Sequence, residues 1–310
     1  MGKDQHIQVL NPRISVVVPT LNEAHNLHHV LPNIPASVYE TILVDGHSTD
    51  GTVEVAREIL PTIRVIQQTG KGKGDALRVG FAACTGDIIV MLDADGSANP
   101  KEIPLFVEAL LKGHEFAKGS RFIKGGGSND ITPLRRLGNF FLCTLVNVLF
   151  VTRFSDLCYG YNAFWKSCLG FLDIDCDGFE VETLMSLRAR KARLKIVEVP
   201  SFEHRRIHGQ SNLRTFRDGW RVLRTIMTER VKNTPTLNAR KIVAKNAPEI
   251  APLAATAAQN LGAEQAREAL VPLTPAPQEI ALESIISVSA VQPPVYEARR
   301  GDSGELAAVK

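Results

Sequence analysis

The chain has 310 residues, of which 44% are hydrophobic and 22% charged, and these values exclude a collagenous, wholly disordered or disulfide-scaffold protein. The formal net charge is only +3, but residues 186–232 carry 13 Lys and Arg against 4 Asp and Glu, whereas residues 1–185 carry 16 against 21. We therefore expect an anionic partner to meet this basic block.

The five cysteines are odd in number and none lies in C-x-x-C spacing, so we expect free thiols in a reducing compartment. The first residues lack the apolar core of a signal peptide. The most apolar stretch, 137–151, is shorter than the about 20 residues that a membrane-spanning helix needs. These features predict a cytoplasmic protein, either soluble or peripheral on the inner face of the plasma membrane.

Strands and helices alternate through the first 92 residues. Short apolar, β-branched runs predict the strands, and apolar residues at helical spacing predict the helices. The predicted strands are 14–18, 40–44, 64–67 and 87–92, and the helices between them begin near residues 22, 52 and 75. This alternation favours a mostly parallel sheet with helices on both faces, and such sheets bind ligands at the carboxyl ends of their strands.

The pattern continues with longer helices and ends in a segment of different composition. The further predicted elements are helix 100–112, strand 115–119, amphipathic helix 133–151, basic helix 181–193, strand 196–199 and arginine-rich helix 213–232. Residues 234–310 hold 17 Ala and 8 of the 17 Pro, and bury too little apolar surface to offset the entropy of ordering. We expect a flexible N-terminus at 1–12, one α/β domain at 13–233 and a mostly disordered tail at 234–310.

Two carboxylates follow the strand at 87–92, in Asp93-Ala94-Asp95. Carboxylates on a bend after a buried strand can hold a hard divalent cation, Mg²⁺ or Mn²⁺. A cation there would neutralise a departing nucleoside diphosphate. The alternative interpretation is a helix cap and a solvated Asp.

Two glycine-containing loops could meet phosphate. Asp45–Thr52 has P-loop glycine spacing, but Thr52 stands where the lysine belongs, so a P-loop is excluded. Asp45 could accept hydrogen bonds from a nucleobase or ribose, and residues 50–52 could equally be a turn and cap. Gly70–Gly74 lacks the last glycine of a dinucleotide fingerprint. It could let the backbone approach an anion beside Lys71 or Lys73, or be a flexible basic turn.

Five motifs follow one another along the chain: Pro19-Thr-Leu-Asn-Glu23, Val44–Thr52, Gly72-Lys-Gly74, Asp93-Ala-Asp95 and Gly119-Ser-Arg121. This ordered set resembles family 2 glycosyltransferases of the GT-A fold, and within them the dolichol- or polyprenyl-phosphate sugar synthases. The resemblance covers residues 13–225. The resemblance implies a single GT-A (Rossmann-like) domain that transfers a hexose with inversion from a UDP- or GDP-sugar, helped by Mg²⁺ or Mn²⁺.

The resemblance also assigns roles on the donor side. It implies a nucleoside pocket lined by Pro19, Thr20, Asn22 and Glu23. Asp45 would hold the base or ribose, with Lys73 near it. Asp93, Ala94 and Asp95 would meet the diphosphate, with both carboxylates on the metal. Ser97 stands where the family often has Gln, a better metal ligand.

On the acceptor side, the resemblance implies that Arg121 faces the acceptor phosphate and that Arg135 or Arg136 is the next basic contact. The segment 155–161 is similar to the family's D-x-x-x-G-F, with Tyr161 for Phe. Glu182 matches a recurring helix glutamate. Arg206 and Ser211 belong to a segment similar to R-x-x-G-x-S-K-L, with Asn212 for Lys.

The acceptor decides which residues are catalytic. A phosphate is already an anion and needs only arginines to position it. A sugar hydroxyl would need a carboxylate to take its proton, with Glu182 as first candidate and Glu180 as second. Alternatively, Glu182 forms a structural ion pair with Arg188 or Arg206.

The helix at 133–151 has a basic start and an apolar body, typical of a helix at a membrane interface or of one packed on a sheet. Four arginines share one face of the next long helix, where they could attract anionic lipid headgroups or form a solvated stripe. They are Arg214, Arg217, Arg221 and Arg224. Nucleic acid is not expected, because no recognition motif accompanies the charge.

The sequence thus predicts an enzyme with Asp95, Glu182 and Arg121 at its catalytic centre. It would move a hexose from a nucleotide sugar to polyprenyl phosphate at the cytosolic membrane face. The alternatives are the same donor chemistry onto a hydroxyl of a glycan or small molecule, and a non-catalytic sugar-nucleotide-binding protein.

Overall fold

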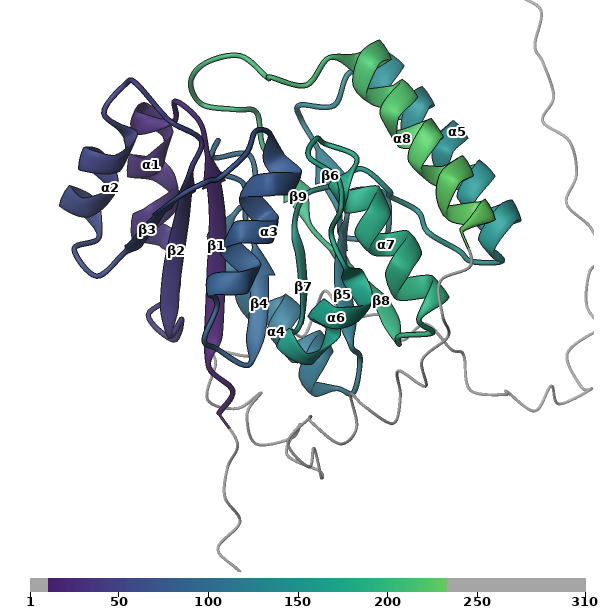
Figure 1. Cartoon of the computed structure of the whole chain (residues 1–310), viewed down its shortest axis with the longest axis horizontal. Coiled ribbons are helices and arrows are strands. Elements are labelled where there is room, and N and C mark those ends of the chain that lie inside the picture. Colours follow the sequence, from purple (N-terminus) through teal and green to yellow (C-terminus); the bar gives the residue numbers. More distant parts are fainter. Residues whose placement is uncertain (1–10, 233–310) are drawn as a thin grey trace, which may run out of the picture. The chain divides into compact units, whose positions relative to one another are not determined.

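A computed structural model describes residues 11–232 of the chain (Figure 1). The predicted tail at 234–310 and nearly all of the predicted N-terminal segment lie outside the described residues. The proposed boundaries of the domain therefore stay predictions.

The centre of the domain is a seven-stranded, mostly parallel sheet, as predicted. The strand order is β3-β2-β1-β4-β7-β5-β8. The strands are β1 Ile14–Thr20, β2 Glu40–Asp45, β3 Arg64–Gln67, β4 Ile88–Met91, β5 Phe116–Ser120, β7 Asn162–Trp165 and β8 Ile196–Pro200. Only β7 runs antiparallel to its neighbours, β4 and β5. A separate two-stranded sheet pairs β6 Gly127–Ser128 with β9 Phe202–Glu203.

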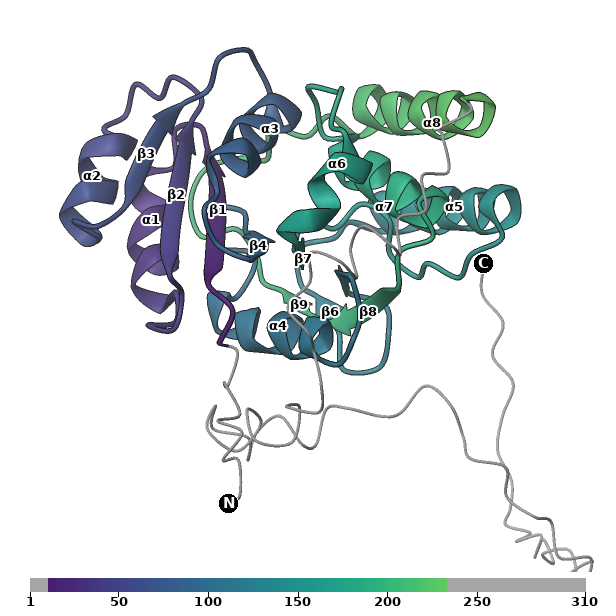
Figure 2. The same cartoon turned by 60° about the horizontal axis from the view of Figure 1, so that its bottom comes forward.

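Helices cover both faces of the sheet, as Figures 1 and 2 show. The α-helices are α1 Ala24–Val30, α2 Thr52–Ile59, α3 Lys73–Ala83, α4 Ile103–Leu111, α5 Pro133–Phe150, α6 Leu169–Leu172, α7 Val181–Lys191 and α8 Thr215–Val231. Short 3₁₀ turns are η1 Leu31–Asn33, η2 Pro100–Glu102 and η3 Lys166–Cys168. The order and type of the predicted helices are thus confirmed, with their ends shifted by a few residues.

The inner strands are apolar along their whole length because they are covered on both faces. Val16, Val17 and Val18 of β1 are fully buried, as are Ile88–Met91 of β4 to within 1%. Helix α3 packs closely on β1 because Gly80 has no side chain: a Cβ there would lie 2.4 Å from Val17 Cγ1. The core therefore fixes the strand ends from which the polar loops project.

Strand β7 is the one central strand that the sequence analysis missed. Its four residues, Asn-Ala-Phe-Trp, give no helical or long alternating pattern. In the fold Phe164 stacks on Phe116 at a 5.8 Å centroid distance and meets Phe81 edge-on at 5.2 Å. Tertiary packing therefore makes this short segment a strand.

A second hydrophobic cluster joins α5, α7 and α8. Leu142 and Val146 from α5, Leu187 from α7, and Val222 and Ile226 from α8 are buried in it. Helices α5 and α8 lie side by side in both views (Figures 1 and 2). Within residues 11–232, no helix is long and apolar enough to cross a membrane.

Candidate functional site

A cleft of about 770 Å³ opens at the carboxyl ends of β1 and β4 and reaches across to α5 and α8. Thr20, which ends β1, and Asp93, two residues after β4, form part of its wall. Gly46 follows β2 and also lines it. The parallel strands thus bring loops that are distant in sequence to one edge, as predicted.

Most of the predicted site residues lie together in this cleft. The predicted residues that line it are Pro19, Thr20, Glu23, Lys73, Asp93, Ala94, Asp95, Arg121, Arg135, Glu182, Arg206 and Ser211. Asn22, Asp45 and Arg136 are not among its lining residues. Asn22, with a left-handed φ of 57°, accepts the Thr49 backbone N–H at 2.9 Å. Buried Asp45 accepts the Ser48 backbone N–H at 3.1 Å.

Lys73 links two carboxylates at the floor of the cleft. Its Nζ lies 2.6 Å from Asp93 Oδ1 and 2.7 Å from Glu182 Oε1. Burial lowers the pKa of Lys73, but Asp93 and Glu182 more than offset this and raise it above its ordinary value. Gly160 permits the approach, since a Cβ there would lie 2.6 Å from Asp93 Oδ2 and 2.8 Å from Lys73 Nζ.

Glu182 is therefore a member of an ion pair, but its partner is Lys73. The predicted pairing with Arg188 or Arg206 is wrong, because Arg188 pairs instead with Glu229 at 3.0 Å. Burial raises the pKa of Glu182, and Lys73 opposes that rise. Glu180, the second candidate for a general base, does not line the cleft.

Arg206 reaches back from the loop after β9 to the other carboxylate of the D-x-D motif. Its two terminal nitrogens lie 2.9 Å from Asp95 Oδ2 and 2.8 Å from Glu23 Oε1. Burial raises the pKa of Glu23, and Asn26 and Arg206 lower it in part. A residue predicted for the acceptor thus contacts two residues predicted for the donor.

The donor atoms of Asp93 and Asp95 suit a hard divalent cation. Both carboxylates face the cleft, and each is now balanced by a protein cation, Lys73 or Arg206. No group of three His, Cys, Asp or Glu within residues 11–232 could hold a metal ion. Mg²⁺ is commonly bound by one or two carboxylates plus substrate phosphates and water, so two carboxylates fit. Ser97 Oγ donates to Asp95 Oδ1 at 2.6 Å and so orients this carboxylate.

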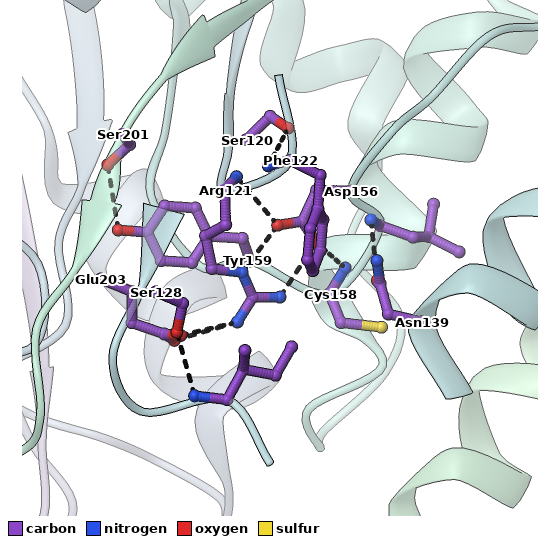
Figure 3. Close-up of polar contacts among 12 residues, drawn as sticks. Ser120, Arg121, Phe122, Ser128, Asn139, Asp156, Cys158, Tyr159, Ser201 and Glu203 are labelled. Carbon is purple, nitrogen blue, oxygen red and sulfur yellow. Dashed lines mark hydrogen bonds and ion pairs between the residues drawn. The ribbon is translucent and has the colours of Figure 1, made fainter. Parts of the chain in front are cut away.

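Arg121 is enclosed by carboxylates (Figure 3). Its Nε and one terminal nitrogen donate to the two oxygens of Asp156 at 2.7 and 3.0 Å, and its other terminal nitrogen donates to Glu203 at 3.0 and 3.1 Å. The guanidinium also lies 4.9 Å from the Tyr159 ring centroid. Burial lowers the pKa of Arg121, but the two carboxylates outweigh burial and raise it. Arg121 thus ties the end of β5 to the 156 loop and β9.

The structure separates the two arginines at the start of α5. Arg135 lines the cleft and donates to the Leu213 carbonyl at 3.3 Å. Arg136 is exposed and lies 5.6 Å from the Phe122 ring centroid, outside the cleft. Of the two candidates, Arg135 is therefore the one placed to meet a ligand.

The glycines of the Gly70–Gly74 loop serve packing. A Cβ on Gly72 would lie 2.2 Å from the Asp177 carbonyl oxygen, and one on Gly74 would lie 2.2 Å from the Cys176 carbonyl oxygen. The Gly74 N–H donates to Asp177 O at 2.9 Å. The backbone that lies against Gly72 and Gly74 is thus that of Cys176 and Asp177, whereas the sequence left an anion contact or a flexible basic turn as the alternatives.

Several residues that line the cleft were not predicted to do so. Gln68 and His47 line it beyond the ends of β3 and β2. Arg214 and Arg217 line it at the start of α8, and for their helix face the sequence left a contact with anionic lipid or a solvated stripe open. Glu203, which holds Arg121, lies on a two-residue strand without a sequence signal. Asp156 could have been found, because it is the acidic residue of the 155–161 motif.

Comparisons with known proteins agree with this geometry. The sequence model described as "Glycosyl transferase family 2" matches residues 15–170. A dolichol-phosphate mannosyltransferase of Pyrococcus furiosus is 31% identical over 211 residues, which are 65% of this chain and 59% of that protein. The low-salt glycan biosynthesis hexosyltransferase Agl6 of Haloferax volcanii is 32% identical over 223 residues, 70% of this chain and 53% of that protein. The chain thus spans between half and three fifths of these two relatives.

A solved structure shares the fold. Glucosyl-3-phosphoglycerate synthase from Mycobacterium tuberculosis, in complex with Mn²⁺, uridine diphosphate and glucosyl-3-phosphoglycerate, superposes with a TM-score of 0.56. The identity is 24%, and the likeness covers 72% of this chain and 82% of that chain. At this identity the likeness concerns the fold alone.

Proposed function

Because the chain belongs to glycosyl transferase family 2 and has the GT-A fold, we propose that this glycosyltransferase moves a hexose from a UDP- or GDP-sugar to polyprenyl phosphate. One observation carries the proposal. A single cleft has the carboxylates of Asp93 and Asp95 at one end and the arginines Arg135, Arg214 and Arg217 at the other. Such a cleft matches a donor that arrives with a cation and an acceptor that is itself an anion.

The donor end accounts for a nucleotide sugar. Asp93 and Asp95 would hold Mg²⁺ or Mn²⁺, which when bound neutralises the diphosphate as it leaves. Glu23 and Thr20 line the wall where the nucleoside would lie. Lys73 keeps the Asp93 carboxylate in place through its 2.6 Å contact. The relative named as a hexosyltransferase supports this assignment.

The acceptor end favours a phosphate over a hydroxyl. Within residues 11–232, neither Arg135 nor Arg214 forms an ion pair, so both guanidinium groups remain available for an anion. An acceptor phosphate oxygen would form the new bond to the anomeric carbon while the bond to the diphosphate breaks, and no proton needs to be removed. Glu182, the candidate base, already binds Lys73 at 2.7 Å. The relative named dolichol-phosphate mannosyltransferase supports a lipid phosphate.

A product assay tests the proposal. The protein is incubated with a panel of UDP- and GDP-sugars, short-chain polyprenyl phosphate, and Mg²⁺ or Mn²⁺. We expect a sugar-phosphate lipid, and no product after chelation of the metal. Transfer that occurs only with a glycan or small-molecule hydroxyl would overturn the acceptor, and binding of the nucleotide sugar without any transfer would favour a non-catalytic binding protein.

A further inference from the structure

The segment 204–208, which follows β9, is attached to the rest of the domain at both of its ends. The His204 backbone N–H donates to the Ser97 carbonyl at 2.8 Å, just after the D-x-D motif. The His208 N–H donates to Asn26 Oδ1 at 2.9 Å, and Asn26 Nδ2 donates back to the His208 carbonyl at 3.1 Å. Asn26 lies on α1, so this pair of bonds joins positions that are 182 residues apart in the chain.

Arg206 lies between these two attachments. Its terminal nitrogens contact Glu23 and Asp95 at 2.8 and 2.9 Å, and all three residues line the cleft. A long arginine side chain loses rotamer freedom when it is held in one place, so its backbone must be fixed for both contacts to persist. The attachments of the 204–208 segment therefore determine whether the guanidinium stays beside the two carboxylates.

Asn26 holds the segment and one of these carboxylates at the same time. It is 2% exposed, and its Nδ2 also donates to Glu23 Oε2 at 2.5 Å. Both N–H groups of the amide and its oxygen are therefore in use, and no apolar side chain can replace them. One buried amide thus fixes Glu23 and the segment that brings Arg206 to Glu23.

The side chains of the segment on either side of this attachment make contacts at the surface. Ile207 is 45% exposed and lies over Gly96, where a Cβ would come 2.9 Å from Ile207 Cδ1. The exposed His208 ring lies near the rings of His25 and His29, with centroid distances of 5.7 and 5.9 Å. Water competes for contacts of this kind, whereas the Asn26 side chain is shielded from it. We therefore expect the Asn26 bonds to dominate in holding this end of the segment.

We propose that Asn26 is a positioning residue of the donor site, which holds the 204–208 segment and Glu23 so that Glu23, Arg206 and Asp95 keep the orientation in which the donor meets them. Asn26 does not line the cleft, so it acts through these residues and not by touching the donor. The inference rests on the proposed function, because the donor that it serves is the nucleotide sugar.

Nucleotide binding to Asn26→Ala tests the proposal, since alanine suits a helix and removes all three hydrogen bonds of the amide. Asn147→Ala is the matched control. Asn147 accepts the Phe154 N–H at 2.7 Å and donates to the Phe154 carbonyl at 2.8 Å, which is the same two-way contact, but it lies outside the cleft. Calorimetry with UDP and with GDP at saturating Mn²⁺ gives the dissociation constants, and melting temperatures verify folding.

We expect nucleotide binding to weaken about tenfold in Asn26→Ala, which corresponds to the loss of one hydrogen bond to a charged group, and to change less than about twofold in Asn147→Ala. A double-mutant cycle separates positioning from a general loss of stability. If Asn26 acts through Arg206, most of the effect of Asn26→Ala should disappear in an Arg206→Met background. An equal loss of binding in both backgrounds would overturn the positioning role.

Ile207→Ser is a second variant that loosens the same segment at an exposed position, so it should fold even where Asn26→Ala does not. We expect it to weaken nucleotide binding about threefold, because the contact with Gly96 is only part of the attachment. An unchanged dissociation constant in folded Asn26→Ala, or in Ile207→Ser where Asn26→Ala does not fold, would overturn the inference and leave the proposed function intact. A wild type that binds neither UDP nor GDP would overturn the proposed function itself.

Discussion

Replacing Arg121 with methionine should destabilise the fold as well as abolish transfer. The Arg121 side chain is 7% exposed, and the Asp156 carboxylate that it binds is fully buried. Removing the guanidinium leaves that carboxylate with two backbone N–H donors, from residues 121 and 158. Loss of one partner of a buried ion pair costs about 3–5 kcal/mol, because the remaining charge stays in the interior without compensation. We expect the free energy of unfolding of Arg121→Met to fall by that amount.

Urea unfolding followed by circular dichroism measures this loss of stability. A double-mutant cycle shows how much of it comes from the Arg121–Asp156 pair. In Arg121→Met/Asp156→Leu both charges are gone, so most of the lost stability should return. Arg121→Lys keeps the charge but cannot make the two parallel hydrogen bonds to Asp156, so it should lie between wild type and Arg121→Met. If Arg121→Met instead unfolds at the same urea concentration as wild type and loses only transfer, the arginine acts on the acceptor, and the positioning role argued from the structure is wrong.

Three further predictions concern the metal, the acceptor and the pH dependence of stability. Asp95→Ala should abolish transfer while the circular dichroism spectrum stays native, and full activity in this variant would remove the metal assignment. Arg135→Ala should raise the KM for the acceptor at least tenfold, whereas exposed Arg136→Ala should change it less than twofold. Burial raises the pKa of Glu40, but hydrogen bonds from Ser15 and neighbouring groups outweigh burial and lower it to about 2. The ionised carboxylate therefore stabilises the fold above pH 4.5, and this contribution is lost as the pH falls toward 2. Glu40→Gln should therefore lose about 1–2 kcal/mol at pH 7, after screening by solvent, and show a flatter stability profile between pH 4.5 and 2 in urea titrations.

The sequence predicts two kinds of element well: strands that are buried on both faces, and helices whose apolar residues recur at helical spacing. The runs around Val16 and Ile89 can only be buried strands, and the apolar spacing of α5 is helical by itself. Strand β7 has no such local signal. It becomes a strand because Phe164 fits between Phe81 and Phe116, and this contact depends on the folded sheet.

The donor residues are predictable for a similar reason. Thr20 ends β1 and Asp93 lies two residues after β4, so the strand that places each of them is visible in the same stretch of sequence. The acceptor residues are placed by long loops and by contacts across the fold. Arg135 and Arg136 are neighbours in one helix turn, and only the packing of α5 decides that the first lines the cleft and the second stacks on Phe122.

The basic residues of the chain have two different surroundings in the fold. Part of the basic block is used to balance acidic residues from the N-terminal part, as when Arg206 binds Glu23 and Asp95 across 183 and 111 positions in the chain. These pairs tie the loop after β9 to the wall of the cleft at the ends of β1 and β4. Two arginines that form no ion pair within residues 11–232, Arg135 from the N-terminal part and Arg214 from the basic block, line the opposite end of the same cleft. Positive charge without a carboxylate partner is therefore present in the cleft at the starts of α5 and α8, which is the arrangement that an anionic acceptor such as a phosphate would use.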